Sequence, residues 1–256
     1  MFNLETHDFT ISKYSKLCET IAENYPTITM SEYISKRHPT KFILMRHDSD
    51  RYPENALKTA FVEMELGIKA TYYFRMNNSV FQPDIIEKIY EMGHEIGYHY
   101  ETLSDAKGNY EKAIKLFGQN LKKFQKLCDI KTISMHGRSL SKYDNRDLWK
   151  VYDYTEFGIL GEAYLSAGKE LNYFSDTGRS WSSKNSVRDF IPGAPKQNDA
   201  DTTDDLIELI KSKKLDNFYL LTHPERWSLN NYRWLYFYLF DFTINLGKKG
   251  IMAVRK

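Results

Sequence analysis

The chain has 256 residues, of which 41% are apolar and 27% charged, a balance typical of a globular protein and not of a disordered one. Its 36 basic and 34 acidic residues leave a net charge of +2, so we expect no nucleic-acid partner. No stretch approaches the ~18–20 apolar residues of a membrane-spanning helix, and the N-terminus carries neither part of a secretory signal; we therefore expect a soluble, cytoplasmic protein.

Helical and strand patterns alternate along most of the chain. An amphipathic helix is predicted over 9–24, Ser31 is the predicted cap of a second short helix, and the apolar run Phe42–Met45 predicts a strand buried on both faces. We then expect strands over 69–75, 94–100, 131–135, 157–160, 171–174 and 217–222, and helices over 53–67, 84–92, 104–127 (capped by Ser104 or Asp105), 203–213 and 228–246.

This alternation predicts an α/β fold of the (β/α)-barrel type. We expect one domain over residues 1–256, made of a helical extension over 1–40 and a barrel over 41–256. Residues 175–200, rich in Ser, Gly and Asn, read as a long irregular loop, and such loops are more often functional than idle in compact domains.

Ionisable side chains gather where the predicted strands end. The first strand is followed by Arg46-His47-Asp48-Ser49-Asp50, and His99, His136 and His223 each lie at the end of a later strand. Because the carboxyl ends of parallel strands meet on one face, we expect these side chains to converge there. His94, five residues before His99, is expected to point to the opposite side of its strand and to be structural.

Carboxylates and imidazoles without thiolates suit Zn²⁺ or another divalent first-row metal. The two cysteines, Cys18 and Cys128, lie far apart and form no CxxC pair. An ion with three protein ligands acidifies water and polarises a carbonyl, while a second carboxylate acts as general base and a histidine as general acid. Such an assembly hydrolyses an amide.

Three motifs together resemble the polysaccharide deacetylase (NodB-homology, carbohydrate esterase family 4-like) superfamily. They are Arg46-His47-Asp48-Ser49-Asp50, the segment 93–99 (Gly-His-Glu-Ile-Gly-Tyr-His) and the segment 220–223 (Leu-Leu-Thr-His). The resemblance covers roughly residues 40–225 and implies a distorted (β/α)7 barrel. It implies Asp48 as catalytic base, His223 as general acid, and Asp50 and His99 as metal ligands.

The chain departs from the family pattern at two places in these motifs. Ser49 separates two aspartates that are usually adjacent, and Leu103 stands where a second metal histidine is expected. His136 is the first choice for the third ligand and Glu101 the second, while His47 either binds the metal or orients Asp48. The sequence therefore resembles a divergent His-Asp-x-Asp branch.

The expected substrate is a carbohydrate, because the resemblance implies removal of an N-acyl group from a sugar. Without an export signal, a nucleotide- or lipid-linked sugar of surface-polysaccharide biosynthesis fits better than a finished polymer. An alternative is a metal-free sugar-binding or transferase-like protein of the same fold, and another is an interaction protein that uses the aromatic helix 228–246. Predicted substrate-binding residues are His47, Glu101, Arg138, Asp176, Arg179 and Arg226.

Overall fold

A computed structural model describes residues 7–138, 141–182, 189–191, 193 and 200–254, with side chains up to residue 243. A parallel sheet with the strand order β6-β5-β4-β3-β2-β8-β7 forms its centre, and β1 pairs with the first half of β2. The strands are β1 (Thr27–Ile28), β2 (Phe42–Ser49), β3 (Thr71–Arg75), β4 (Glu95–Tyr100), β5 (Thr132–Met135), β6 (Gly161–Glu162), β7 (Asn172–Ser175) and β8 (Asn217–Thr222).

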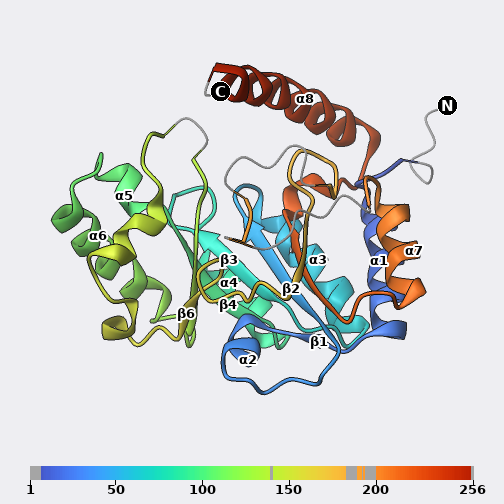
Figure 1. The fold of residues 1–256 in the computed structure, drawn as a ribbon, viewed down its shortest axis with the longest axis horizontal. Coiled ribbons are helices and arrows are strands. Elements are labelled where there is room, and N and C mark those ends of the chain that lie inside the picture. The colour runs from blue at the N-terminus through green and yellow to red at the C-terminus, as the bar shows by residue number, and fades with distance from the viewer. Residues whose placement is uncertain (1–6, 139–140, 183–188, 192, 194–199, 255–256) are drawn as a thin grey trace.

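Helices surround this sheet (Figure 1). The α-helices are α1 (Ile11–Asn24), α2 (Met30–Ile34), α3 (Pro53–Glu65), α4 (Pro83–Glu91), α5 (Thr102–Asp105), α6 (Tyr110–Phe124), α7 (Thr203–Ser212) and α8 (Asn231–Val254). The part of the chain that the structure describes also contains the 3₁₀ turns η2 (Asn145–Lys150), η3 (Tyr154–Phe157) and η5 (Pro224–Arg226). The predicted α/β fold of the barrel type is confirmed; the sheet is a curled half-barrel whose path ends at β6 and β7.

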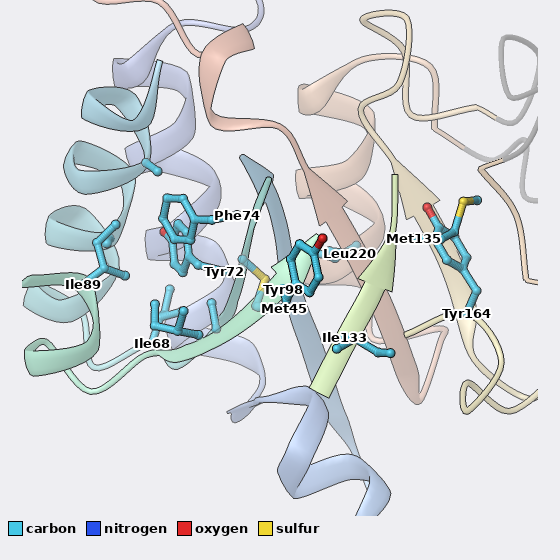
Figure 2. Packing of buried hydrophobic residues seen from close by; sticks show 14 of the residues in the cluster. Met45, Ile68, Tyr72, Phe74, Ile89, Tyr98, Ile133, Met135, Tyr164 and Leu220 are labelled. Atoms are coloured by element: carbon cyan, nitrogen blue, oxygen red, sulfur yellow. The ribbon is translucent and has the colours of Figure 1, made fainter. Parts of the chain in front are cut away.

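The two faces of the sheet bury two different clusters. Along β2, Ile43 and Met45 face the outer cluster, which also contains side chains of α1, α3, α4, α6 and α7, whereas Phe42 and Leu44 face the inner cluster. Figure 2 shows the outer residues Met45, Tyr72, Phe74, Tyr98 and Leu220 packed together. Because neighbouring strand residues point to opposite faces, this parity also decides which polar side chains enter the half-barrel.

Several predicted boundaries are wrong, for local reasons. The first strand continues to Ser49, so most of the polar cluster lies inside β2 and not after it. The expected helix over 104–127 is broken by the positive φ angles of Lys107 (52°) and Gly108 (84°), and α6 is capped by Asn109. Thr29, not Ser31, caps α2 through a capping box with Glu32.

Two further predictions need correction in the second half. The strand expected over 157–160 is the 3₁₀ turn η3 followed by the two-residue β6, and α8 begins at Asn231 and runs to Val254. Much of the predicted loop 175–200 lies outside the described residues. Among the helices that the structure describes, none is long and apolar enough to cross a membrane.

Candidate active site

Side chains alternate between the two faces of each strand, and this alternation brings five predicted residues together at the carboxyl ends of the strands. Asp48 is an even-numbered residue of β2 and points inward with Phe42 and Leu44, and Asp50 follows at the end of the same strand. His99 in β4, His136 directly after β5 and His223 directly after β8 have the same inward parity. The sequence prediction that these strand ends converge on one site therefore agrees with the described geometry.

Gly97 makes room for this inward face. A Cβ atom on Gly97 would lie 2.3 Å from the ring of Tyr73 and 2.8 Å from the Thr132 carbonyl oxygen. Tyr73 crosses β4 at that level, and its hydroxyl contacts the Thr132 hydroxyl at 2.7 Å. Only glycine lets the ring pass two residues below His99, which explains why the Gly-x-His spacing occurs here.

Asp50 faces two imidazoles. Its Oδ1 lies 3.4 Å from His99 Nε2 and 3.5 Å from His136 Nε2. In each ring the other nitrogen is engaged: His99 Nδ1 contacts the Ser134 carbonyl oxygen at 3.0 Å and His136 Nδ1 contacts a Glu101 carboxylate oxygen at 2.9 Å. Carbonyl and carboxylate oxygens only accept hydrogen bonds, so both Nδ1 atoms donate, and Nε2 is the nitrogen of each ring that faces Asp50.

Asp50 and His136 shift each other's pKa values. Burial opposes ionisation of Asp50, but the facing His136 and His99 outweigh it and hold the pKa of this carboxyl well below its ordinary value. Burial likewise opposes charging of His136, yet Asp50 and Glu101 raise its pKa to about 9. Without another cation, a proton on His136 therefore balances Asp50 at neutral pH.

The same donor set suits a divalent ion. Asp50 Oδ1 is buried and has no hydrogen-bond partner in the described part of the chain. Ligand atoms about 2.0–2.1 Å from a tetrahedral Zn²⁺ lie about 3.3 Å from one another, close to the separations between Asp50 and the two histidines. Although the donor types fit, no group of three or more His, Cys, Asp or Glu side chains among the described residues could hold a metal ion as the side chains stand.

Asp48 is fixed by an arginine of its own strand. Arg46, fully buried two residues earlier, donates from Nε and Nη2 to the two carboxylate oxygens at 2.8 and 2.6 Å. Arg46 also donates to the hydroxyls of Tyr219 and Ser134, so its guanidinium cannot rotate freely. Asp48 Oδ2 in turn lies 3.4 Å from His99 Nε2, which places the carboxylate beside Asp50 and the imidazoles.

His223 is oriented by a buried carboxylate. Its Nδ1 donates to Asp176 Oδ1 at 2.6 Å and its backbone N–H donates to Asp176 Oδ2 at 2.9 Å. Arg226 Nη1 donates to the same carboxylate at 2.8 Å. Burial and Arg226 oppose charging of His223, but Asp176 outweighs them and raises the pKa of the imidazole above its ordinary value. The imidazole therefore keeps its proton to a higher pH than an ordinary histidine, and its Nδ1 is fixed by Asp176.

Glu101 supports His136 from the side. Its Oε1 accepts hydrogen bonds from Arg75 Nε and Nη2 at 3.0 and 2.6 Å, and its Oε2 accepts from His136. Burial opposes ionisation, but His136 and Arg75 lower the pKa of Glu101 to about 2. Of the two candidates for the third metal ligand, His136 faces Asp50, and Glu101 holds His136.

The structure corrects the prediction for His47. Its odd parity turns it to the outer face, where Nε2 lies 2.7 Å from Glu63 of α3 and Nδ1 contacts the Thr222 hydroxyl at 2.5 Å. His47 is fully buried there and cannot bind substrate or metal at the inner face. His94 shares this outer cluster, 3.7 Å from Glu63, which agrees with the expectation that it is structural.

Three residues that the sequence predicted to bind substrate, Asp176, Arg179 and Arg138, make other contacts in the structure. Asp176 is fully buried and holds His223, so it cannot contact a substrate directly. Arg179 Nε donates to Asp241 of α8 at 3.0 Å, and its Nη2 donates to the Arg226 carbonyl oxygen, so it ties α8 to the strand ends. Arg138 lies at the exposed rim, where Nη1 donates to Asp105 at 2.7 Å.

The sequence analysis missed Glu225. It follows His223 and Pro224 in η5, is 5% exposed, and its Oε2 has no partner among the described residues. Burial and the nearby Asp50 raise the pKa of this carboxyl to about 7. The available signal was its place two residues after an inward-facing histidine at the end of β8.

No protein-family model and no curated protein match this chain. Solved structures that match include a mutant, with restored enzymatic activity, of the CE4 family pseudoenzyme BA3943 of Bacillus anthracis, at 15% identity and a TM-score of 0.43 over 73% of this chain. The chain covers 58% of that protein, less than two thirds of its length.

Two further matches are enzymes by name. A family 4 carbohydrate esterase from Bacillus anthracis is 16% identical, with a TM-score of 0.40 over 98% of this chain and 94% of the esterase. The peptidoglycan deacetylase PdaC from Bacillus subtilis is 13% identical, with a TM-score of 0.39 over 72% of this chain and 88% of that one. Because all of these identities lie below 25%, the chemistry of the site is inferred from the contacts described above and not from these matches.

Proposed function

We propose that this protein is a metal-dependent hydrolase that removes an N-acyl group, such as acetyl, from a sugar or sugar precursor of surface-polysaccharide biosynthesis. The observation that carries the proposal is the meeting of Asp50 Oδ1 with the Nε2 atoms of His99 and His136, beside the carboxylate of Asp48. Carboxylate and imidazole ligands without thiolate favour Zn²⁺.

Asp50, His99 and His136 are the residues that would hold the ion. A divalent ion bound there supplies Lewis acidity, which polarises an acyl carbonyl and makes water nucleophilic at neutral pH. The two histidines would present Nε2 to the ion in a fixed direction, because their Nδ1 atoms are held by the Ser134 carbonyl oxygen and by Glu101.

Asp48 and His223 would move the protons. Asp48, held by Arg46, is the general base that takes the proton of the attacking water, and His223 is the general acid that protonates the departing amine. The raised pKa of His223, caused by Asp176 against the opposing effect of burial, keeps this donor charged to higher pH. The C–N bond breaks and the amine leaves with the proton from Nε2.

The substrate class rests on the motifs and on the charge at the site's rim. A nucleotide- or lipid-linked sugar carries phosphate groups, which guanidinium groups bind well. Arg138 lies at the exposed rim and Arg226 beside His223, and both are proposed to contact the substrate. Arg179 is proposed to act through its contact with Arg226 and not by direct binding.

The test is acyl release by the purified protein. Protein loaded with Zn²⁺ is incubated with nucleotide-linked and oligomeric N-acetylhexosamines, and acetate is measured by enzymatic assay. We expect Asp48→Asn and His223→Ala each to lower kcat by about 10²–10⁴-fold. Because Asp48 pairs with the fully buried Arg46, Asp48→Asn also lowers stability, and circular dichroism is used to check that each variant is folded. Full retention of turnover in both variants would refute these roles.

A second candidate is a metal-free sugar-binding protein of the same fold. It is favoured by one observation: both oxygens of Asp48 are already bound by Arg46. This candidate predicts sugar binding by calorimetry that is unchanged by chelator, together with no acetate release, whereas the hydrolase requires the metal for turnover.

A further inference from the structure

A fully buried carboxylate lies on the outer face of the sheet, away from the candidate site. Glu63 of α3 accepts hydrogen bonds from the hydroxyls of Tyr14 in α1 and Tyr72 in β3, the latter at 2.7 Å. His47 Nε2 lies 2.7 Å and His94 Nδ1 3.7 Å from the same carboxylate. Burial opposes ionisation, but His47 outweighs it and holds the pKa of Glu63 below its ordinary value. Groups from α1, α3, β2 and β3 therefore meet at one charged side chain.

The imidazole of His47 connects this cluster to β8. Its Nδ1 lies 2.5 Å from the Thr222 hydroxyl, and both side chains are fully buried. His47 and Thr222 are also register partners in the parallel pairing of β2 with β8. Their side chains therefore join the two strands on the outer face, near the carboxyl ends of both.

The next residue of each strand belongs to the candidate site. Asp48 follows His47 and His223 follows Thr222, and both turn to the inner face because neighbouring side chains point to opposite faces. A shift of β2 against β8 would therefore change the separation of Asp48 and His223. Misplacement of reacting groups by about 1 Å can cost roughly 100-fold in rate.

The contacts on the inner face hold these two groups one at a time. Arg46 fixes the Asp48 carboxylate, and Asp176 fixes the His223 imidazole. The contact between His47 and Thr222 differs from both, because it joins the two strands that carry the groups. It is thus placed to control the distance between them.

We propose that His47 and Thr222, with Glu63 behind His47, are positioning residues that set the separation of Asp48 and His223. The inference rests on the proposed function, because it concerns the same two proton-transferring groups. Since His47 and Thr222 are buried on the outer face, they act through the backbones of β2 and β8 and not by contact with a substrate. Loss of this positioning should lower kcat and leave KM nearly unchanged.

Removal of one hydroxyl group tests this role. Thr222→Val keeps the shape of the side chain and removes its contact with His47, whereas Thr222→Ser keeps the hydroxyl. Thr59→Val is the matched control, because Thr59 is equally buried in the same cluster and its hydroxyl lies 3.1 Å from that of Tyr72. We expect Thr222→Val to lower kcat at least about tenfold with KM within about twofold. Thr222→Ser and Thr59→Val should keep the kcat of the wild type, while urea unfolding shows a similar loss of stability in the two valine variants.

The imidazole of His223 provides a second measurement, which needs no turnover. NMR titration gives its pKa, and comparison with His223→Ala assigns its signal. Asp176 raises the pKa of His223 through a short contact, which a shifted end of β8 would lengthen. We therefore expect Thr222→Val to move this pKa at least about half a unit toward its ordinary value, and Thr59→Val and Thr222→Ser to leave it unchanged.

The possible results separate the two proposals. A wild type that releases acetate, with the same kcat and the same His223 pKa in Thr222→Val, overturns the positioning role while the hydrolase proposal stands. Equal falls in kcat in Thr222→Val and Thr59→Val would show a merely structural role and also overturn it. A wild type that releases no acetate overturns the hydrolase proposal, and the His223 pKa in Thr222→Val then decides whether the pair positions this imidazole. If Thr222→Val does not fold, Thr222→Ala, which also lacks the hydroxyl, takes its place.

Discussion

At the scale of single residues, two features determine which groups meet at the candidate site. They are the face of the strand to which each side chain points and the direction of the hydrogen bonds that each imidazole makes. Asp48 and His47 are neighbours in β2, yet one faces the imidazoles of the inner face and the other faces Glu63 of α3. His99 and His136 present Nε2 inward because their Nδ1 atoms donate to fixed oxygen acceptors. The orientation of the imidazoles therefore depends on acceptors such as Glu101 and Asp176.

The role of Asp176 gives a prediction at this scale. Asp176→Asn removes the charge that raises the pKa of His223, so the imidazolium is lost at lower pH. Because the proposed role of His223 requires its protonated form, we expect the alkaline limb of the kcat–pH profile to move to lower pH and kcat at neutral pH to fall about tenfold or more. Lys169→Met, a change of one exposed charge away from the site, is the control. An unmoved alkaline limb would show that His223 is not the proton donor.

The sequence was enough to bring the inward-facing residues to one edge of the sheet, because that placement depends only on where the strands end. Asp48, Asp50, His99, His136 and His223 were predicted to converge because each closes or follows an apolar run. His47 was misplaced because the strand was taken to end at Met45, and parity applies only once β2 is known to continue to Ser49. The burial of Glu225 and the contacts of Asp176 with His223 and Arg226 could not be predicted, since they join elements that are distant in the sequence.

At the scale of elements, β2 and β4 determine the site. β2 is buried along its whole length and pairs with β1, β3 and β8, so it cannot shift without breaking three pairings. β4 holds His99 at a fixed height because His99 pairs with Arg75 in β3 and Ser134 in β5. The sequence predicted both strands, the first of them from its apolar run, but it did not predict the break between α5 and α6, where two residues with positive φ end the turn.

Gly97 gives the prediction for β4. A methyl group at this position would overlap the Tyr73 ring and the Thr132 carbonyl oxygen, so Gly97→Ala should cost about 1–3 kcal/mol of unfolding free energy. Gly118→Ala is the control, because its new Cβ would meet only the edge of the Phe157 ring, at 3.1 Å. Urea unfolding measures both; equal stability of Gly97→Ala and wild type would contradict the close approach.

At the scale of the whole molecule, the half-barrel carries its charges in two layers. The outer layer holds Glu63 with His47 and His94, all buried among helices, while the inner layer holds the candidate site. The helix α8 lies beyond the strand ends (Figure 1), where Asp241 binds Arg179 and the Phe237 ring packs on Tyr52. The ionisable groups of the inner layer make the stability of the fold depend on pH.

The pH dependence of stability follows from two groups of that layer in the chelator-treated protein. Glu101 has its pKa lowered from 4.5 to about 2, so its contribution is present above pH 4.5 and is lost as the pH falls toward 2. His136 has its pKa raised from 6.5 to about 9, so its contribution is present below pH 6.5 and is lost as the pH rises through 9. We expect the free energy of unfolding to be highest between these limits.

Urea unfolding of the metal-free protein from pH 3 to about pH 10 measures this profile. His136→Ala should remove the loss on the alkaline side, because the folded protein then has no imidazolium at that position to lose. The same alkaline decline in His136→Ala as in the wild type would show that another group is responsible. Saturating Zn²⁺ should reverse the alkaline decline, since the ion replaces the proton on His136.

Asp50, His99 and His136 are proposed to hold a divalent ion, and the metal content of the protein tests this most directly. The protein is purified without chelator, and its metal is measured by inductively coupled plasma mass spectrometry, beside Asp50→Asn prepared in the same way. We predict about one zinc or other divalent first-row ion per chain in the wild type and its loss in Asp50→Asn. Trace metal in the wild type, or equal metal in both proteins, would contradict the account.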